Sequence, residues 1–67
     1  PTLNTSLTER EKEVFQLIAE GMQSDQIASE LNISINTVNR HRENIKTKIN
    51  VKSVAQMVSW WHNNNKL

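Results

Sequence analysis

The chain has 67 residues, enough for one small domain with a minimal core and little room for an enclosed active site or a bound cofactor. It contains no cysteine, which excludes disulfides and thiolate metal sites and is compatible with a reducing cytoplasm, and no apolar run approaches the ~20 residues of a membrane span. The net charge of +1 hides an asymmetry, because two basic and six acidic side chains give residues 1–33 a charge of −4, whereas six basic and one acidic give residues 34–67 a charge of +5.

One glycine, one proline and apolar residues at helical spacing predict an all-α fold. The first helix is expected at about 8–20. Thr8 and Glu11 have the spacing of a capping box, in which each side chain binds the other residue's backbone amide. Gly21 is expected to end this helix in a left-handed conformation.

A short second helix is expected at about 24–31, with Ser24 as its N-cap. Asn32 follows, and asparagine tolerates a positive φ better than other non-glycine residues, which predicts a tight turn. Ser34 then caps a longer third helix at about 35–49. A short helix, a tight turn and a longer basic helix form the plan of a helix-turn-helix.

The fourth helix is expected at about 53–62, where Ser53 and Gln56 have the spacing of another capping box. Its apolar set recurs at i, i+3, i+4 and i+7 and consists of Val54, Met57, Val58 and Trp61. The predicted core of the first three helices consists of Val14, Leu17, Ile18, Ile27, Leu31, Val38, Ile45 and Ile49.

The expected organisation is one domain with short flanks. A linker remnant is expected at 1–6, the folded domain at 7–62 and a frayed tail at 63–67.

The third helix carries the pattern that indicates function. At 100° per residue, its apolar residues fall together and the opposite face is polar. That face consists of Asn36, Asn39, Arg40, Glu43 and Thr47. Asparagine can pair with adenine, arginine with guanine, and glutamate can accept from the cytosine amino group. The residues predicted to contact base edges of double-stranded DNA are therefore Asn36, Asn39, Arg40 and Glu43, as the basic character of the helix also indicates.

Cations near this face are candidates for phosphate contacts. Lys46 and Lys48 flank it toward the C-terminal end of the helix. Arg42 lies closer to the apolar arc, so it either lays its stem on the core or contacts a phosphate. His41 lies at the edge of the buried face and is expected to be a packed, hydrogen-bonded histidine, although a phosphate contact stays open.

Spaced positions over roughly residues 7–58 resemble the LuxR-type (GerE-like) helix-turn-helix domain. They are Leu7-Thr8-x-Arg10-Glu11-x-Glu13-Val14, Ile18-Ala19-x-Gly21, Ile27-Ala28, Leu31-x-Ile33-Ser34, Thr37-Val38-x-x-His41, Asn44-Ile45 and Lys48-Ile49-x-Val51. The resemblance implies a four-helix DNA-binding domain of a bacterial, cytoplasmic transcription regulator. It also implies that the third helix enters the major groove, that the fourth helix forms a dimer contact, and that the domain follows a receiver or ligand-binding domain, as in response regulators.

The resemblance also assigns individual residues. Thr37 and Lys48 match positions that usually meet the DNA backbone, and Ser34 at the start of the same helix is placed with them. Asn39 stands where the family most often has a lysine. Glu43 adds a negative charge to the groove face, so base preference cannot be transferred by analogy. The family commonly has an arginine at the position of Val54.

The fourth helix has an ambiguous apolar surface. Two adjacent tryptophans are not expected to bury on one face, so an exposed tryptophan indicates a partner surface. A homodimer is predicted through Val54, Val58, Trp60 and Trp61.

Alternative functions are weaker but stay open. His41 and His62 lie on different helices and Asp25 is the only aspartate, so neither catalytic residues nor a metal site is predicted. The chief rival is a protein-interacting helical module, or a domain like sigma-factor region 4 that docks on RNA polymerase.

Overall fold

Four helices make up the part of the chain that the computed structural model describes, residues 7–64. They are α1 (Glu9–Ala19), α2 (Ser24–Leu31), α3 (Ile35–Ile49) and α4 (Val54–Asn64). Residues 7–64 contain no strand, so the all-α prediction is confirmed. The predicted linker at 1–6 and the last three residues of the predicted tail lie outside the described residues.

The boundaries agree with the sequence to within one or two residues. The largest difference is at the end of α4, which runs to Asn64, where the side-chain Nδ2 donates to the Trp60 carbonyl at 2.9 Å. The Thr8–Glu11 capping box is present, with Thr8 Oγ1 accepting from Glu11 N at 3.1 Å. Gly21 has a φ of 98°, so the predicted left-handed stop is confirmed.

Two caps differ from the prediction. The N-cap of α2 is Gln23, which forms the capping box with Gln26, while Ser24 is the first helical residue. The hydroxyl of Ser24 is therefore not needed for capping. Before α4, Ser53 Oγ accepts from Gln56 N at 3.1 Å as expected, but Gln56 Oε1 accepts from Lys52 N instead of completing the box.

The core forms around α1, whose buried face packs against the other three helices. Phe15 lies at its centre and is fully buried, although it was absent from the predicted core. Trp60 stacks on Phe15 with ring centroids 5.7 Å apart, and Trp61 contacts the same ring at 4.8 Å. Both tryptophans are half-buried, so the expectation that one of them is exposed is wrong. Both indole rings are accommodated because each contacts the ring of Phe15.

Leu17 and Leu31 were predicted as core and are only partly buried at its margin. The fully buried positions also include Met57, which anchors α4. Within residues 7–64, no helix is long and apolar enough to cross a membrane.

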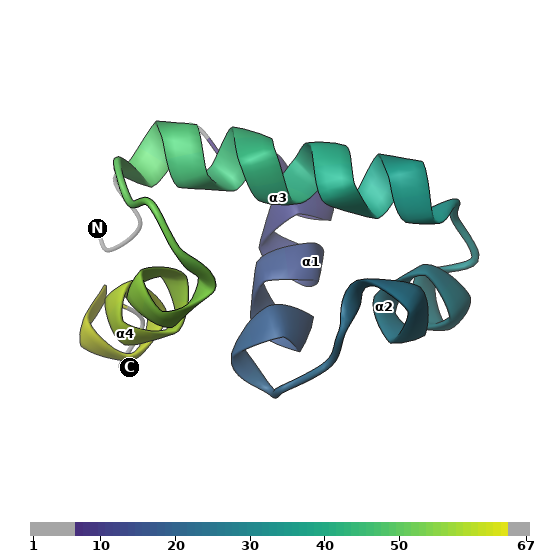
Figure 1. Cartoon of the computed structure of the whole chain (residues 1–67), viewed down its shortest axis with the longest axis horizontal. Coiled ribbons are helices and arrows are strands. Elements are labelled where there is room, and N and C mark those ends of the chain that lie inside the picture. Colours follow the sequence, from purple (N-terminus) through teal and green to yellow (C-terminus); the bar gives the residue numbers. More distant parts are fainter. Residues whose placement is uncertain (1–6, 65–67) are drawn as a thin grey trace.

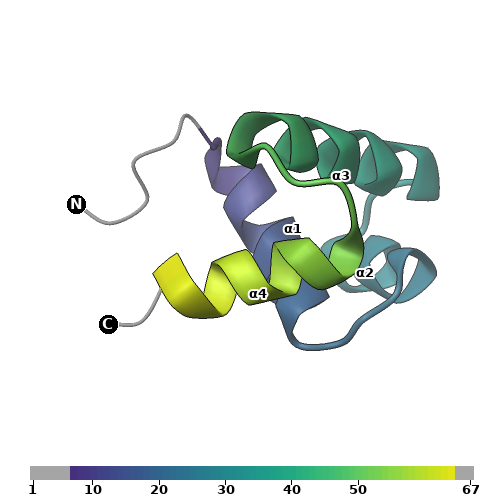
Figure 2. The ribbon, with the colours of Figure 1, turned by 60° about the vertical axis from the view of Figure 1, so that its left-hand side comes forward.

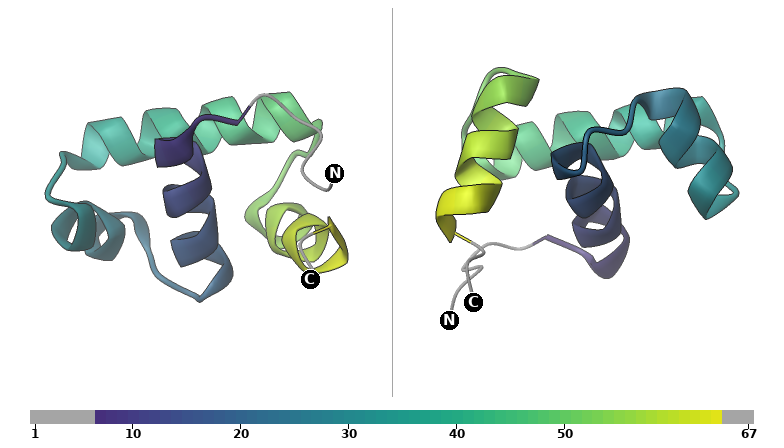
Figure 3. Two further views of the ribbon diagram at one scale, coloured as in Figure 1. Left: turned by 180° about the vertical axis from the view of Figure 1, so that it is seen from behind. Right: turned by 90° about the horizontal axis from the view of Figure 1, so that it is seen from below.

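Helix α3 runs along one edge of the molecule, and α1, α2 and α4 all lie on the same side of it (Figure 1). The view from behind and the view from below give the same arrangement (Figure 3). Helices α4 and α2 lie on opposite sides of α1 (Figure 1), and α4 crosses α1 (Figure 2). One side of α3 therefore faces the core, and the other faces away from the protein.

An ion pair joins the acidic first helix to the basic third helix. Lys48 Nζ lies 2.7 Å from Glu11 Oε1, and the Glu11 side chain is only 4% exposed. Burial alone raises the pKa of Glu11, but hydrogen bonds from Lys48 and Thr8, with the electrostatic effects of Lys48 and His41, bring it below the ordinary value of 4.5. The carboxylate therefore stabilises the fold above pH 4.5, and this contribution is lost as the pH falls below that value.

Lys48→Met should lower the free energy of unfolding by about 1–3 kcal/mol at pH 7, because it leaves a buried carboxylate without its ammonium partner. The difference from wild type should shrink as the pH falls from 4.5 through the lowered pKa of Glu11, where the carboxylate of the folded protein becomes protonated. Urea unfolding followed by circular dichroism measures both effects. Lys12→Met is the control, since its pair with Glu9 is exposed and worth ~0–1 kcal/mol. Equal losses in the two variants would contradict the assignment.

Candidate nucleic-acid interface

The turn between α2 and α3 sets the direction of α3. Asn32 ends α2 with a φ of 59° and a ψ of 47°, the left-handed conformation that was predicted. Ile33 N then donates to the Ala28 carbonyl at 3.0 Å, which closes the end of α2. Ser34 caps α3 as predicted, with its Oγ accepting from Thr37 N at 3.0 Å and lying 2.9 Å from Thr37 Oγ1.

A narrow apolar stripe holds α3 against the rest of the protein. Val38 and Ile45 are fully buried and Ile49 is 8% exposed. The opposite side is exposed at every position predicted to contact bases. These positions are Asn36, Asn39, Arg40 and Glu43, and Thr47 on the same face is exposed as well.

The Arg40 side chain is exposed on this face. It makes no hydrogen bond or ion pair with any other residue between 7 and 64. Glu43 is different, because its Oε2 lies 3.0 Å from Lys46 Nζ, one turn further along α3. The pair is solvent-exposed on the Glu43 side, whose side chain is 72% exposed. Lys46 therefore offsets the negative charge that Glu43 places on this face.

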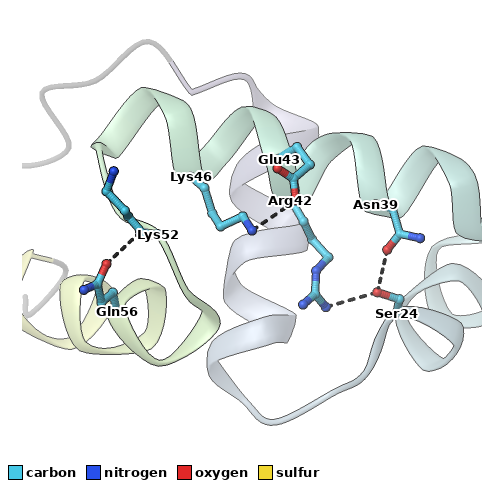
Figure 4. A network of polar contacts seen from close by, with 7 residues as sticks. All are labelled: Ser24, Asn39, Arg42, Glu43, Lys46, Lys52 and Gln56. Carbon is cyan, nitrogen blue, oxygen red and sulfur yellow. Dashed lines mark hydrogen bonds and ion pairs between the residues drawn. The ribbon is translucent and has the colours of Figure 1, made fainter.

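Ser24 joins two α3 residues in a polar chain (Figure 4). Arg42 Nη1 donates to Ser24 Oγ at 3.0 Å, and Ser24 Oγ donates to Asn39 Oδ1 at 2.9 Å. Arg42 is half-buried, so the alternative in which its stem packs against the protein agrees with the structure. Its guanidinium has five N–H donors, and the bond to Ser24 uses one of them.

Lys48 and His41 differ in detail from the expectation. Lys48 is an exposed residue, but its ammonium binds the buried carboxylate of Glu11 on α1, a partner that was not predicted. His41 is half-buried, but its Nδ1 is buried without a hydrogen-bond partner. The expected hydrogen bond is therefore absent at that nitrogen within residues 7–64.

The predicted dimer residues on α4 separate into two groups. Val54 is 38% exposed, whereas Val58, Trp60 and Trp61 are half-buried and pack against the core. Between residues 7 and 64, no group of three or more histidine, aspartate or glutamate side chains could hold a metal ion.

The sequence did not reveal the roles of two residues. Ser24 has the chemistry of an N-cap, and only the packing of α2 beside α3 shows that its hydroxyl reaches Asn39 and Arg42. Glu11 was assigned to the capping box alone, yet it also binds Lys48 from 37 residues away. A helical wheel that places Glu11 beside the apolar face of α1 was the one available signal for its burial.

Comparison with known proteins identifies the family. The model of bacterial regulatory proteins of the luxR family matches residues 5–61. The chain is 43% identical over 63 residues to the CsgBAC operon transcriptional regulatory protein of Escherichia coli K12, covering 94% of this chain and 29% of that protein. It is 44% identical over 59 residues to the transcriptional regulatory protein LiaR of Bacillus subtilis 168, covering 88% and 28%.

A solved structure has the same fold. The response regulator StyR superposes with a TM-score of 0.84 at 46% sequence identity, over 87% of this chain and 29% of that one. The chain thus spans less than a third of the length of these relatives. The chain belongs to the LuxR family of bacterial regulatory proteins, and its four helices are that family's DNA-binding helix-turn-helix domain.

Proposed function

We propose that this domain binds double-stranded DNA sequence-specifically by placing α3 in the major groove. The observation that carries the proposal is the position of α3 at the edge of the molecule, with Asn36, Arg40 and Glu43 exposed on its outer side. The major groove is about 12 Å wide and admits one helix. No other described helix combines an exposed polar face with an excess of basic residues.

The side chains on this face divide by their chemistry. Arg40 can donate two parallel hydrogen bonds to guanine O6 and N7, the commonest specific contact in the major groove. Asn36 offers both a donor and an acceptor, which suits adenine. Glu43 can only accept, so it suits the amino group of cytosine.

Phosphate contacts are proposed at both ends of this face. Ser34 and Thr37 lie at the N-terminus of α3, where unpaired backbone amides and the helix dipole favour an anion. Arg42 and Lys46 follow along the helix, and each keeps N–H donors beyond the one used within the protein. Lys48 is left out of this set because it holds Glu11.

We further propose that two copies associate through the outer side of α4. This helix contains no aspartate, glutamate, lysine or arginine, and depletion of charge is typical of interface cores. Its exposed side includes Val54, Ala55 and Ser59, which are small enough for close helix packing. The two tryptophans pack against Phe15, so Val54 is the best-placed residue of the predicted interface.

The relatives are longer transcriptional regulators, so we propose that the domain directs a larger protein to its promoter or operator. Docking on RNA polymerase or another protein is the alternative outcome. A salt titration distinguishes DNA binding from protein binding. For DNA, the logarithm of the binding constant falls linearly with the logarithm of the salt concentration, with a slope of about −0.9 per phosphate neutralised. Binding to a protein through an apolar contact is far less sensitive to salt.

Arg40→Ala should cost about 1–3 kcal/mol of binding at the preferred site and relax selection at one base pair, because a bidentate contact is lost. Selection from a randomised duplex pool, followed by titration of the selected site, measures both effects. Arg10→Ala is the matched control, since it removes the same charge from an exposed arginine on α1. An unchanged site preference in Arg40→Ala would count against the proposed groove face.

Glu43→Gln should raise affinity for non-specific DNA by roughly threefold at low salt, since an exposed charge contributes ~0.2–1 kcal/mol. The change removes a negative charge from the proposed interface and leaves Lys46 without its partner. Fluorescence anisotropy on a duplex without a selected site measures the effect. Glu13→Gln is the control, because Glu13 forms the equivalent i,i+3 pair with Arg10 at 3.0 Å on α1. A similar gain from both variants would mean that net charge alone is responsible.

Val54→Asp should change the DNA complex from two subunits to one, because a carboxylate in an apolar interface lacks a partner. The domain itself should tolerate the change, since an acidic residue in the first turn of α4 favours the helix dipole. Sedimentation of the protein–DNA complex measures the stoichiometry. Ser29→Asp on α2 is the control. A two-subunit complex in Val54→Asp would contradict the proposed interface.

A further inference from the structure

The polar chain through Ser24 determines which atoms Asn39 turns outward. Asn39 is exposed on α3, and Ser24 is the first residue of α2. Their side chains meet at 2.9 Å although the residues lie 15 positions apart. Because Gln23 supplies the cap of α2, the Ser24 hydroxyl is available for this contact.

The chemistry of Arg42, Ser24 and Asn39 determines which group donates and which accepts in each hydrogen bond. A guanidinium can only donate, so Ser24 Oγ is the acceptor of the 3.0 Å bond from Arg42. A serine hydroxyl has one proton, and this proton points to Asn39 Oδ1. The amide oxygen of Asn39 is thereby engaged with α2, and its NH₂ group is turned away from Ser24 (Figure 4).

This orientation changes the base that Asn39 suits. Recognition of adenine by asparagine needs the amide oxygen to accept from N6 and the amide nitrogen to donate to N7. An asparagine whose oxygen is held by Ser24 presents its two N–H donors instead. Two N–H donors suit a base whose major-groove edge offers hydrogen-bond acceptors. Guanine offers acceptors at O6 and N7, and thymine offers one at O4.

We infer that Ser24 is a positioning residue that presents Asn39 to the groove as a hydrogen-bond donor, so that the base under Asn39 is guanine or thymine and not adenine. The inference rests on the proposed docking of α3. It differs from the expectation from residue type alone, in which asparagine pairs with adenine. Ser24 itself lies on α2 and acts through Asn39.

The test is selection from a randomised duplex pool with wild-type protein and four variants. Asn39→Ala maps the base pair that lies under Asn39. Ser24→Ala removes the hydroxyl while adding a strong helix former at a helical position, so the fold should be retained. Ser24→Thr keeps a hydroxyl and is the conservative rescue. Arg40→Ala reports separately on the groove face.

At the base pair mapped by Asn39→Ala, wild type and Ser24→Thr should read guanine or thymine. Because every base pair has one of these on one strand, 7-deaza purines at that pair assign the base. In wild type, 7-deazaguanine should weaken binding if the pair is G·C, and 7-deazaadenine should leave binding unchanged if it is A·T, since only an adenine contact would use adenine N7. Ser24→Ala should shift the ratio of adenine to the wild-type base upward by roughly tenfold, because the freed amide can then form the two-bond contact with adenine. Loss of stability alone would lower affinity at every position without changing the preferred base at one of them.

Two results would overturn the inference, and they are distinguishable. If Ser24→Ala keeps the wild-type preference while Arg40→Ala changes selection at its own base pair, the groove face is correct and the role of Ser24 is wrong. If neither Arg40→Ala nor Asn39→Ala changes selection anywhere, the proposed function fails and the inference fails with it.

Discussion

The burial of one apolar stripe of α3 is the constraint on which the rest of the structure depends. Val38, Ile45 and Ile49 can leave water only by packing against α1 and its neighbours, and this burial fixes the rotation of α3 about its own axis. The polar side of the helix must then face outward along its whole length. Because α1, α2 and α4 all lie on the buried side, no other part of residues 7–64 covers the proposed groove face.

The same packing accounts for the distribution of charge. Helix α1 is rich in acidic residues and α3 is rich in basic residues. The ion pair between Glu11 and Lys48 joins these two helices of opposite charge. One lysine is thereby used to hold the helices together, which leaves Arg40, Arg42 and Lys46 as the cations proposed to meet DNA. One basic residue of α3 therefore stabilises the fold, and other basic residues of the same helix are proposed to bind DNA. The sequence alone does not show which residue has which role.

Much of the fold was predictable because local rules and burial agree. The capping box at Thr8, the left-handed Gly21 and Asn32, and the cap at Ser34 all act within a few residues, so they can be recognised in the sequence. The exposed face of α3 follows from helical periodicity. Phe15 was missed although it lies three residues before Ile18 on the buried face of α1. The two tryptophans were misjudged because their shared contact with the Phe15 ring is tertiary.

The sequence by itself determined the four helices, their order and the polar face of the third, because each depends on hydrogen bonds and periodicity within one segment. It also determined the family, since many spaced positions agree at once. Only the tertiary structure decided that Lys48 binds Glu11, that Ser24 holds Asn39 and Arg42, and that both tryptophans pack on Phe15. Those contacts join residues 15 to 46 positions apart, and the distance between such side chains is set by how whole helices pack.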